Sequence, residues 1–178
     1  MSWPVVFGVC ENDLQRDQEF LRAFAQVRRV DLSLTPLGGP VLTDRAARLL
    51  GRRLEAAAAA GIEVAALLIH SDADTRSAAK HRAEILAWAR RQRLRVPVIP
   101  CAPEPCLERW LCRCAELKGA SAPAAAPCEG WKKSWSRPRG VDLDRVREAA
   151  GLAATRLRGL PDFDAFERDW RARLPVHR

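Results

Sequence analysis

The acidic side chains that follow two apolar runs are the residues best suited to chemistry in this sequence. Glu11 follows the run 5–9, and Asp72 and Asp74 follow a second run that ends before His70. In an extended backbone alternate residues point to the same side, so Asp72 and Asp74 can aim both carboxylates at one point. Three clustered carboxylates repel one another unless a cation neutralises them, and Mg²⁺ prefers oxygen ligands. The spacing predicts a Mg²⁺ site, with Mn²⁺ as a substitute, suited to phosphoryl transfer; the alternative is that Asp72 or Asp74 caps the next helix.

A second group of acidic residues follows a later apolar run. Glu104 and Glu108 are four residues apart, which predicts that both lie on one face near the start of a helix. There they either interact favourably with the helix dipole or provide a second metal position or a water-orienting base.

Basic residues near these acids are candidates for nucleic-acid contacts. Arg76, Lys80 and Arg82 lie on the predicted helix after Asp74, where they would contact the backbone phosphates, ordinary surface charge being the alternative. Lys132 and Lys133 would place a cation against a scissile phosphate, unless they are solvated loop lysines. Two tryptophans that flank them, Trp131 and Trp135, could stack on exposed bases, whereas the core is the expected place of Trp3, Trp88, Trp110 and Trp170.

Histidines and cysteines give weaker signals. His70 and His81 are expected to be hydrogen-bonded structural residues. The six cysteines are expected to be reduced, because the first residues lack the basic start and long apolar centre of a signal peptide, and a cytoplasmic location follows. Four of them cluster, but Cys112 and Cys114 are one residue too close for the usual zinc knuckle.

The composition favours a polyanionic partner. The 178 residues contain 30 Lys plus Arg and 22 Asp plus Glu, which gives a formal net charge of +8. Only four of the basic residues are lysines, and arginine forks suit phosphate groups. Biased codon usage is the alternative explanation. No apolar run approaches the roughly 20 residues that cross a bilayer, and no GxxxxGK[ST] loop is present, so we expect neither a membrane span nor ATP hydrolysis by this chain.

Apolar periodicity predicts the elements that must position these residues. Strands are expected at 5–9, 29–35, 64–69 and 96–99, and helices at 15–27, 43–61, 75–93 and 105–118. Thr43 is the expected N-cap of the second helix and Gly61 its end. The alternation predicts an α/β fold with a mostly parallel four-stranded sheet flanked by helices over 1–118. An Ala/Pro-rich linker at 119–127 and a small C-terminal helical extension over 128–178, with helices at 142–157 and 162–174, complete the prediction.

Three segments resemble a known family. Val9-Cys10-Glu11 with Phe20-Leu21 is similar to the opening of RloB-like Toprim proteins, and the segment 105–111, PCLERWL, closely resembles their Pro-Cys-Phe-Glu-x-Trp-Leu signature. Trp131 to Ser134 and the Phe-containing stretch 161–166 are similar to a related Toprim-like group of bacterial proteins. The chain departs from the family where Asn12 replaces a glycine and Gln15-Arg16 replaces a Thr-Glu pair.

The resemblance implies a Toprim-like fold and a Mg²⁺-dependent nuclease site. Glu11 would be general acid/base or metal ligand, Asp72 and Asp74 metal ligands, and Glu108 a further acid. RloB-like and OLD-type Toprim proteins are associated with bacterial defence, often beside an ABC-type or AAA ATPase. The leading hypothesis is therefore an endonuclease acting on DNA or RNA, as monomer or oligomer. The alternative is a degenerate Toprim-like module that docks an ATPase or binds nucleic acid, and a third is nucleotidyl or other phosphotransfer at the same site.

Overall fold

The fold is built on a four-stranded parallel sheet. The computed structural model describes residues 2–11, 15–115 and 142–174. The sheet has the order β2-β1-β3-β4, and all three pairs of neighbours are parallel. Its strands are β1 (Val5–Cys10), β2 (Asp31–Pro36), β3 (Val64–His70) and β4 (Val98–Cys101). The predicted α/β class is confirmed, with the apolar β3 inside the sheet and β4 at its edge.

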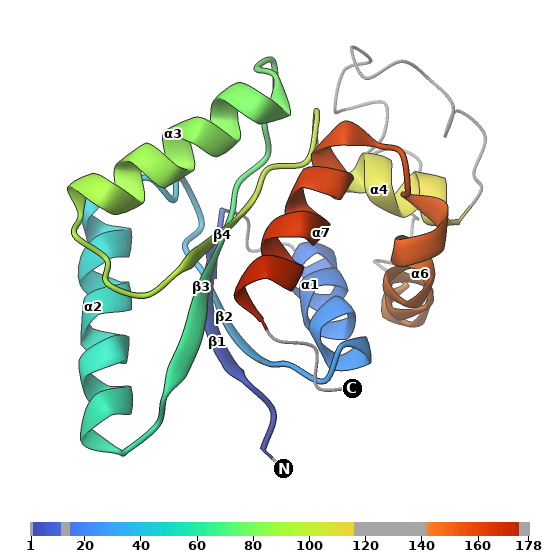
Figure 1. The fold of residues 1–178 in the computed structure, drawn as a ribbon. Coiled ribbons are helices and arrows are strands. Elements are labelled where there is room, and N and C mark those ends of the chain that lie inside the picture. The colour runs from blue at the N-terminus through green and yellow to red at the C-terminus, as the bar shows by residue number, and fades with distance from the viewer. Residues whose placement is uncertain (1, 12–14, 116–141, 175–178) are drawn as a thin grey trace.

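Helices cover both faces of this sheet, so the molecule has three layers (Figure 1). One face carries α2 (Asp44–Ala59) and α3 (Ala78–Arg91). The other face carries α1 (Gln15–Val27), α4 (Leu107–Cys114), α6 (Leu143–Arg156) and α7 (Pro161–Arg173). Each predicted helix is present, with ends that differ by a few residues.

An aromatic cluster joins the C-terminal helices to the rest of the fold. Phe24 of α1 lies 5.2 Å from Phe166 and 5.1 Å from Trp170 of α7 between ring centroids. Trp110 of α4 lies 5.2 Å from Phe163. Rings at such distances add to the free energy gained from their burial. Residues of α6 and α7 therefore share one core with α1 and α4.

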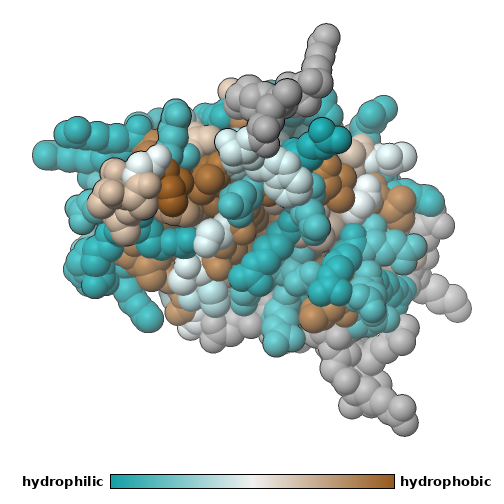
Figure 2. Space-filling model, turned by 90° about the horizontal axis from the view of Figure 1, so that it is seen from below, coloured by the Kyte–Doolittle hydropathy of each residue, from teal (hydrophilic) through white to brown (hydrophobic). Residues whose placement is uncertain are grey.

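The core positions predicted for three tryptophans are confirmed, and the fourth is wrong. Trp88, Trp110 and Trp170 are buried, whereas Trp3 is 45% exposed. Trp3 precedes β1 and therefore lies beyond the region that the helices cover. Exposed Val27 and Ile62 likewise precede β2 and β3. Figure 2 views the molecule from this end, where hydrophobic residues form separate patches among hydrophilic ones.

Side-chain caps set the starts of the helices on the α2–α3 face. Thr43 Oγ1 accepts a hydrogen bond from Ala46 N at 3.2 Å, as predicted for the N-cap of α2. Ser77 Oγ caps α3 in the same way through Lys80 N. The interpretation that Asp72 or Asp74 caps α3 is therefore wrong, because α3 begins later than its apolar pattern predicts.

Candidate functional site at the carboxyl edge

The carboxyl ends of the strands bring segments that are distant in sequence to one edge of the sheet. Cys10 pairs in register with Pro36 on one side and His70 on the other, and His70 pairs with Cys101. The residues that follow the four strands, here called the carboxyl edge, are therefore neighbours. In open parallel sheets this is the edge where ligands bind.

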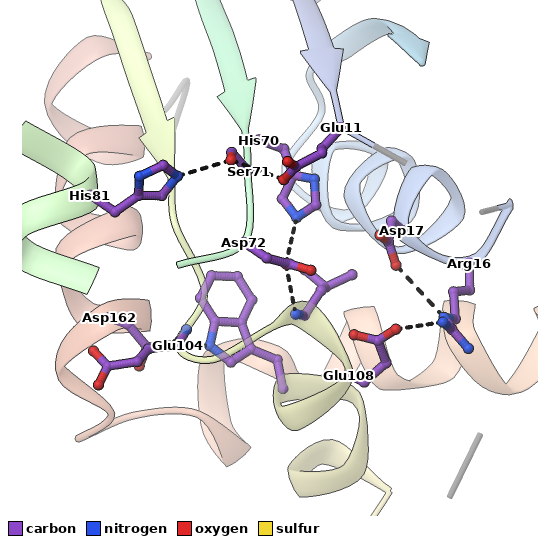
Figure 3. A network of polar contacts seen from close by, with 12 residues as sticks. Glu11, Arg16, Asp17, His70, Ser71, Asp72, His81, Glu104, Glu108 and Asp162 are labelled. Carbon is purple, nitrogen blue, oxygen red and sulfur yellow. Dashed lines mark hydrogen bonds and ion pairs between the residues drawn. The ribbon is translucent and has the colours of Figure 1, made fainter. Parts of the chain in front are cut away.

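Glu11 sits at this edge in a hydrogen-bonded chain (Figure 3). The Ser71 hydroxyl donates to Glu11 Oε2 at 3.0 Å. His81 Nε2 lies 2.9 Å from Ser71 Oγ, and its Nδ1 lies 3.1 Å from Glu84 Oε2. The hydrogen bond from His81, together with the nearby Arg76 guanidinium, lowers the pKa of Glu84. The structural, hydrogen-bonded role predicted for His81 is confirmed.

Ser71, His81 and Glu84 stand in the order of a Ser–His–acid triad, which the sequence analysis did not find. The usable signal was the spacing of His81 and Glu84, three residues apart on one helix. The Ser71 side chain is buried, and its hydroxyl also bonds to a carboxylate. A nucleophilic serine needs access to substrate and a site that stabilises negative charge. The arrangement therefore orients Glu11 and does not present Ser71 as a nucleophile.

Asp72 turns inward from the edge. Its Oδ1 accepts a hydrogen bond from Leu107 N at 3.1 Å, at the start of α4, and lies 3.6 Å from His70 Nε2. Burial acts to lower the pKa of His70, but the carboxylates of Asp72, Asp17 and Glu11 outweigh it and raise the pKa overall. His70 is therefore a buried neighbour of Asp72, and the surrounding carboxylates favour its protonated form.

A second buried cation neutralises the acids on the α1 side. Arg16 donates to Glu108 Oε1, and its Nε lies 3.8 Å from Asp17 Oδ1. All three side chains are buried. Burial, with Asp17 close by, raises the pKa of Glu108 to about 7, although Arg16 opposes the shift. Glu108 is thus a member of an internal ion-pair cluster.

Two predicted pairs of carboxylates do not share one side of a regular element. In both cases the backbone turns where the sequence pattern predicted a continuous strand or helix. Asp74 is exposed and has a left-handed φ of 53°, so Asp72 and Asp74 are not alternate residues of one extended strand. Glu104 precedes α4 and accepts a hydrogen bond from Ala78 N at 2.7 Å. Since α4 begins only at Leu107, Glu104 and Glu108 do not share a helical face.

The positions of these acids decide whether the expected Mg²⁺ site can form. In the ranges that the structure describes, no group of three or more His, Cys, Asp or Glu side chains is arranged to hold a metal ion. The ligand set Glu11, Asp72 and Asp74 thus does not fit Mg²⁺ as arranged here, and neither do the clustered cysteines fit zinc. Cys106 is disulfide-bonded, so the expectation of reduced thiols is wrong for it. Spacing along a chain does not reveal which thiols meet in space.

The predicted nucleic-acid contacts lie in different environments. Arg82 Nε donates to Asp169 Oδ2 of α7 at 2.8 Å, and Arg76 Nη1 lies 3.1 Å from Glu84. Lys80 is exposed. The predicted contacts Lys132 and Lys133, and the stacking candidates Trp131 and Trp135, lie outside the described residues.

Comparisons of this chain with protein-family models, with curated proteins and with solved structures find no match. Within the described part of the chain, no helix is long and apolar enough to cross a membrane.

Proposed function

We propose that this chain is a nucleic-acid-binding module related to the Toprim proteins, in which the acids of the carboxyl edge serve structure. The α/β sheet and the resemblance of the segment 105–111 to the RloB-like signature support the family. One observation carries the function: among the described residues, buried Asp and Glu outnumber buried Lys and Arg by five to one. Five carboxylates are buried, those of Asp17, Asp72, Glu108, Asp162 and Asp169.

The burial of these acids increases the positive charge that the surface carries. Arg16 is the one buried Lys or Arg among the described residues. Removing the five buried carboxylates raises the formal charge of +8 by five, and removing Arg16 lowers it by one, which leaves +12 for all other residues, including those outside the described ranges. A surface with this excess attracts polyanions, and arginine forks bind phosphate oxygens in pairs.

Each buried acid already has a partner inside the protein. Asp72 faces His70 and Leu107 N, and Glu108 and Asp17 face Arg16. On α7, Asp162 accepts from Trp110 Nε1 at 2.7 Å and Asp169 accepts from Arg82. Arg16 stands where the family pattern has the acid of its Thr-Glu pair. A cation in place of an acid supports an internally neutralised edge over a metal-dependent one.

Salt-dependent binding is the test. Fluorescence polarisation would compare labelled duplex DNA, single-stranded DNA and RNA of one length between 50 and 200 mM salt. Non-specific binding of this kind has a Kd of about 10⁻⁴ to 10⁻⁶ M, with a log–log salt slope of about −0.9 per duplex phosphate contacted. We expect a Kd in this range and a slope steeper than about −3. A Kd weaker than this range at 50 mM salt for all three ligands would overturn the proposal.

A second candidate is the metal-dependent endonuclease, and the position of Glu11 favours it. Glu11 is only half-buried and lies at the edge where open parallel sheets bind ligands. Purified protein would be incubated with plasmid, single-stranded DNA and tRNA in Mg²⁺, Mn²⁺ or EDTA. Cleavage that needs the metal and is lost in folded Glu11→Gln and Asp72→Asn variants would establish hydrolysis and overturn the purely structural role of the edge. An ATPase partner would then be tested in the same assay.

A further inference from the structure

We infer that the nucleic-acid backbone lies along an arginine surface on the α2–α3 face of the molecule. This inference rests on the proposed function and specifies the part of the chain that binds. The arginine surface consists of six exposed residues on α2 and at the end of α3: Arg45, Arg48, Arg52, Arg90, Arg91 and Arg93.

Helix α2 presents its arginines outward. Arg45, Arg48 and Arg52 are spaced i, i+3 and i+7, which places them on one face over about 10 Å of helix. The opposite face carries Ala46, Leu50 and Ala57, which are buried. The burial of the apolar face directs the arginines away from the sheet.

The end of α3 extends this surface. Gln92 Nε2 donates to Asp44 Oδ1 at 3.2 Å, which joins the C-terminal end of α3 to the first residue of α2. Figure 1 shows the same crossing, with the end of α3 over the start of α2. The arginines on either side of Gln92 are therefore brought toward Arg45 and Arg48. The start of α2 is also near the carboxyl edge, because Gly39 N donates to Glu11 O at 2.8 Å.

The guanidinium groups of this surface are available for a ligand. Within the described ranges, none of the six guanidinium groups makes a hydrogen bond or an ion pair. Arg53 of the same helix differs, since it stacks on Phe7 at 4.3 Å and donates to Thr35 Oγ1 at 2.7 Å. Arg53 is thus bound to side chains of the sheet, whereas Arg48 and Arg52 on the same helix are exposed. Uncommitted guanidinium forks are the groups that bind phosphate oxygens in pairs.

The surroundings favour a nucleic acid over a lipid surface. Helices that lie on membranes insert an apolar face between the lipids. The large exposed hydrophobic residues of the described chain lie elsewhere: Trp3, Val27, Ile62 and Leu152. The acidic residues on α2 beside the arginines are Asp44, which accepts from Gln92, and Glu55. Glu55 lines a shallow groove with Arg48, Arg52 and Gly51.

The test compares two triple variants with the same change of charge. The first is Arg45→Gln/Arg48→Gln/Arg52→Gln. The control is Arg113→Gln/Arg158→Gln/Arg168→Gln, which changes exposed arginines of α4, α7 and the α6–α7 connection, on the other side of the sheet. If all three α2 arginines contact phosphates of a 20-bp duplex, the salt slope falls by about 2.7. Wild type should then lose about 40-fold more affinity than the α2 variant between 50 and 200 mM salt.

Two further measurements, one with the variant Glu55→Gln and one with lipid vesicles, distinguish the possible outcomes. Glu55→Gln should strengthen duplex binding because it removes the acid beside Arg48 and Arg52, and this result does not depend on a triple variant that folds. Equal losses in the two triple variants, or no gain in Glu55→Gln, would overturn the arginine surface while nucleic-acid binding itself stands. No binding by wild type would remove the proposed function as well. Tighter binding to vesicles rich in anionic lipid, lost in the α2 variant, would assign the surface to a membrane.

Discussion

The buried carboxyl of Glu108 should make the stability of the fold depend on pH, and Glu108→Gln should abolish that dependence. Burial and Asp17 raise the pKa of Glu108 from 4.5 to about 7 in the folded protein. In the unfolded chain the carboxyl titrates near its ordinary value. Between about pH 4.5 and 7 the folded state therefore binds more protons than the unfolded state, and stability falls as the pH rises.

The size of the effect follows from the shift. Each pKa unit corresponds to about 1.4 kcal/mol, so the free energy of unfolding should fall by about 3 kcal/mol as pH rises from 4.5 to 7. Above that window the contribution of Glu108 is constant. Glutamine keeps the size of the side chain and does not titrate, so the variant should lack this fall.

Urea unfolding at pH 5, 6, 7 and 8 measures the difference directly. Subtracting the free energy of unfolding of Glu108→Gln from that of wild type cancels the titration of all other groups. We expect this difference to decrease across the series. Glu63→Gln is the control, since Glu63 is exposed. A difference that stays constant or grows with pH would refute the assignment and would show that Arg16 keeps Glu108 ionised throughout.

Three further variants test the packing of β1 and the stability of α2. Gly8→Ala should destabilise the fold by about 1–3 kcal/mol, because a Cβ there would lie 2.6 Å from Leu34 Cδ1 and 3.0 Å from Leu68 O. Its control, Gly51→Ala on α2, has no atom within 4 Å of the new Cβ and should stabilise by about 0.5–1 kcal/mol. Thr43→Ala should cost about 1 kcal/mol by removing the N-cap of α2. Urea midpoints check all three, and a Gly8→Ala variant as stable as wild type would contradict the close packing of β1 on β2 and β3.

The order of the elements could be predicted from sequence because it depends on local signals. Apolar runs locate β1 and β3, and Thr43 and Gly61 bound α2. The strand order β2-β1-β3-β4 depends on which strands meet in space, and no local signal in the sequence encodes it. The prediction that Glu11 and Asp72 follow strands at one edge needs only the parallel order, and the structure agrees with it.

The details of the site depend on backbone turns that periodicity does not show. Asp74 lies in a left-handed turn after β3, and α4 begins only at Leu107, so two predicted carboxylate pairs separate. The charged surroundings of His70 could not be predicted from the sequence either. Asp17 of α1 and Glu11 come near its ring only in the folded chain, where they raise its pKa together with Asp72.

Buried ion pairs seldom add stability relative to well-packed apolar side chains, because the loss of hydration opposes the attraction. The buried acids and their arginine partners, Arg16 and Arg82, therefore need another explanation, and the positions of the acids on α7 provide one. Asp169 binds Arg82 of α3 across the edge of β4, and Asp162 binds Trp110 of α4. These bonds connect α7 to α3 on one face of the sheet and to α4 on the other. The same bonds hold Asp162 and Asp169 away from solvent, so the contacts that fasten α7 also add to the net positive charge of the remaining surface.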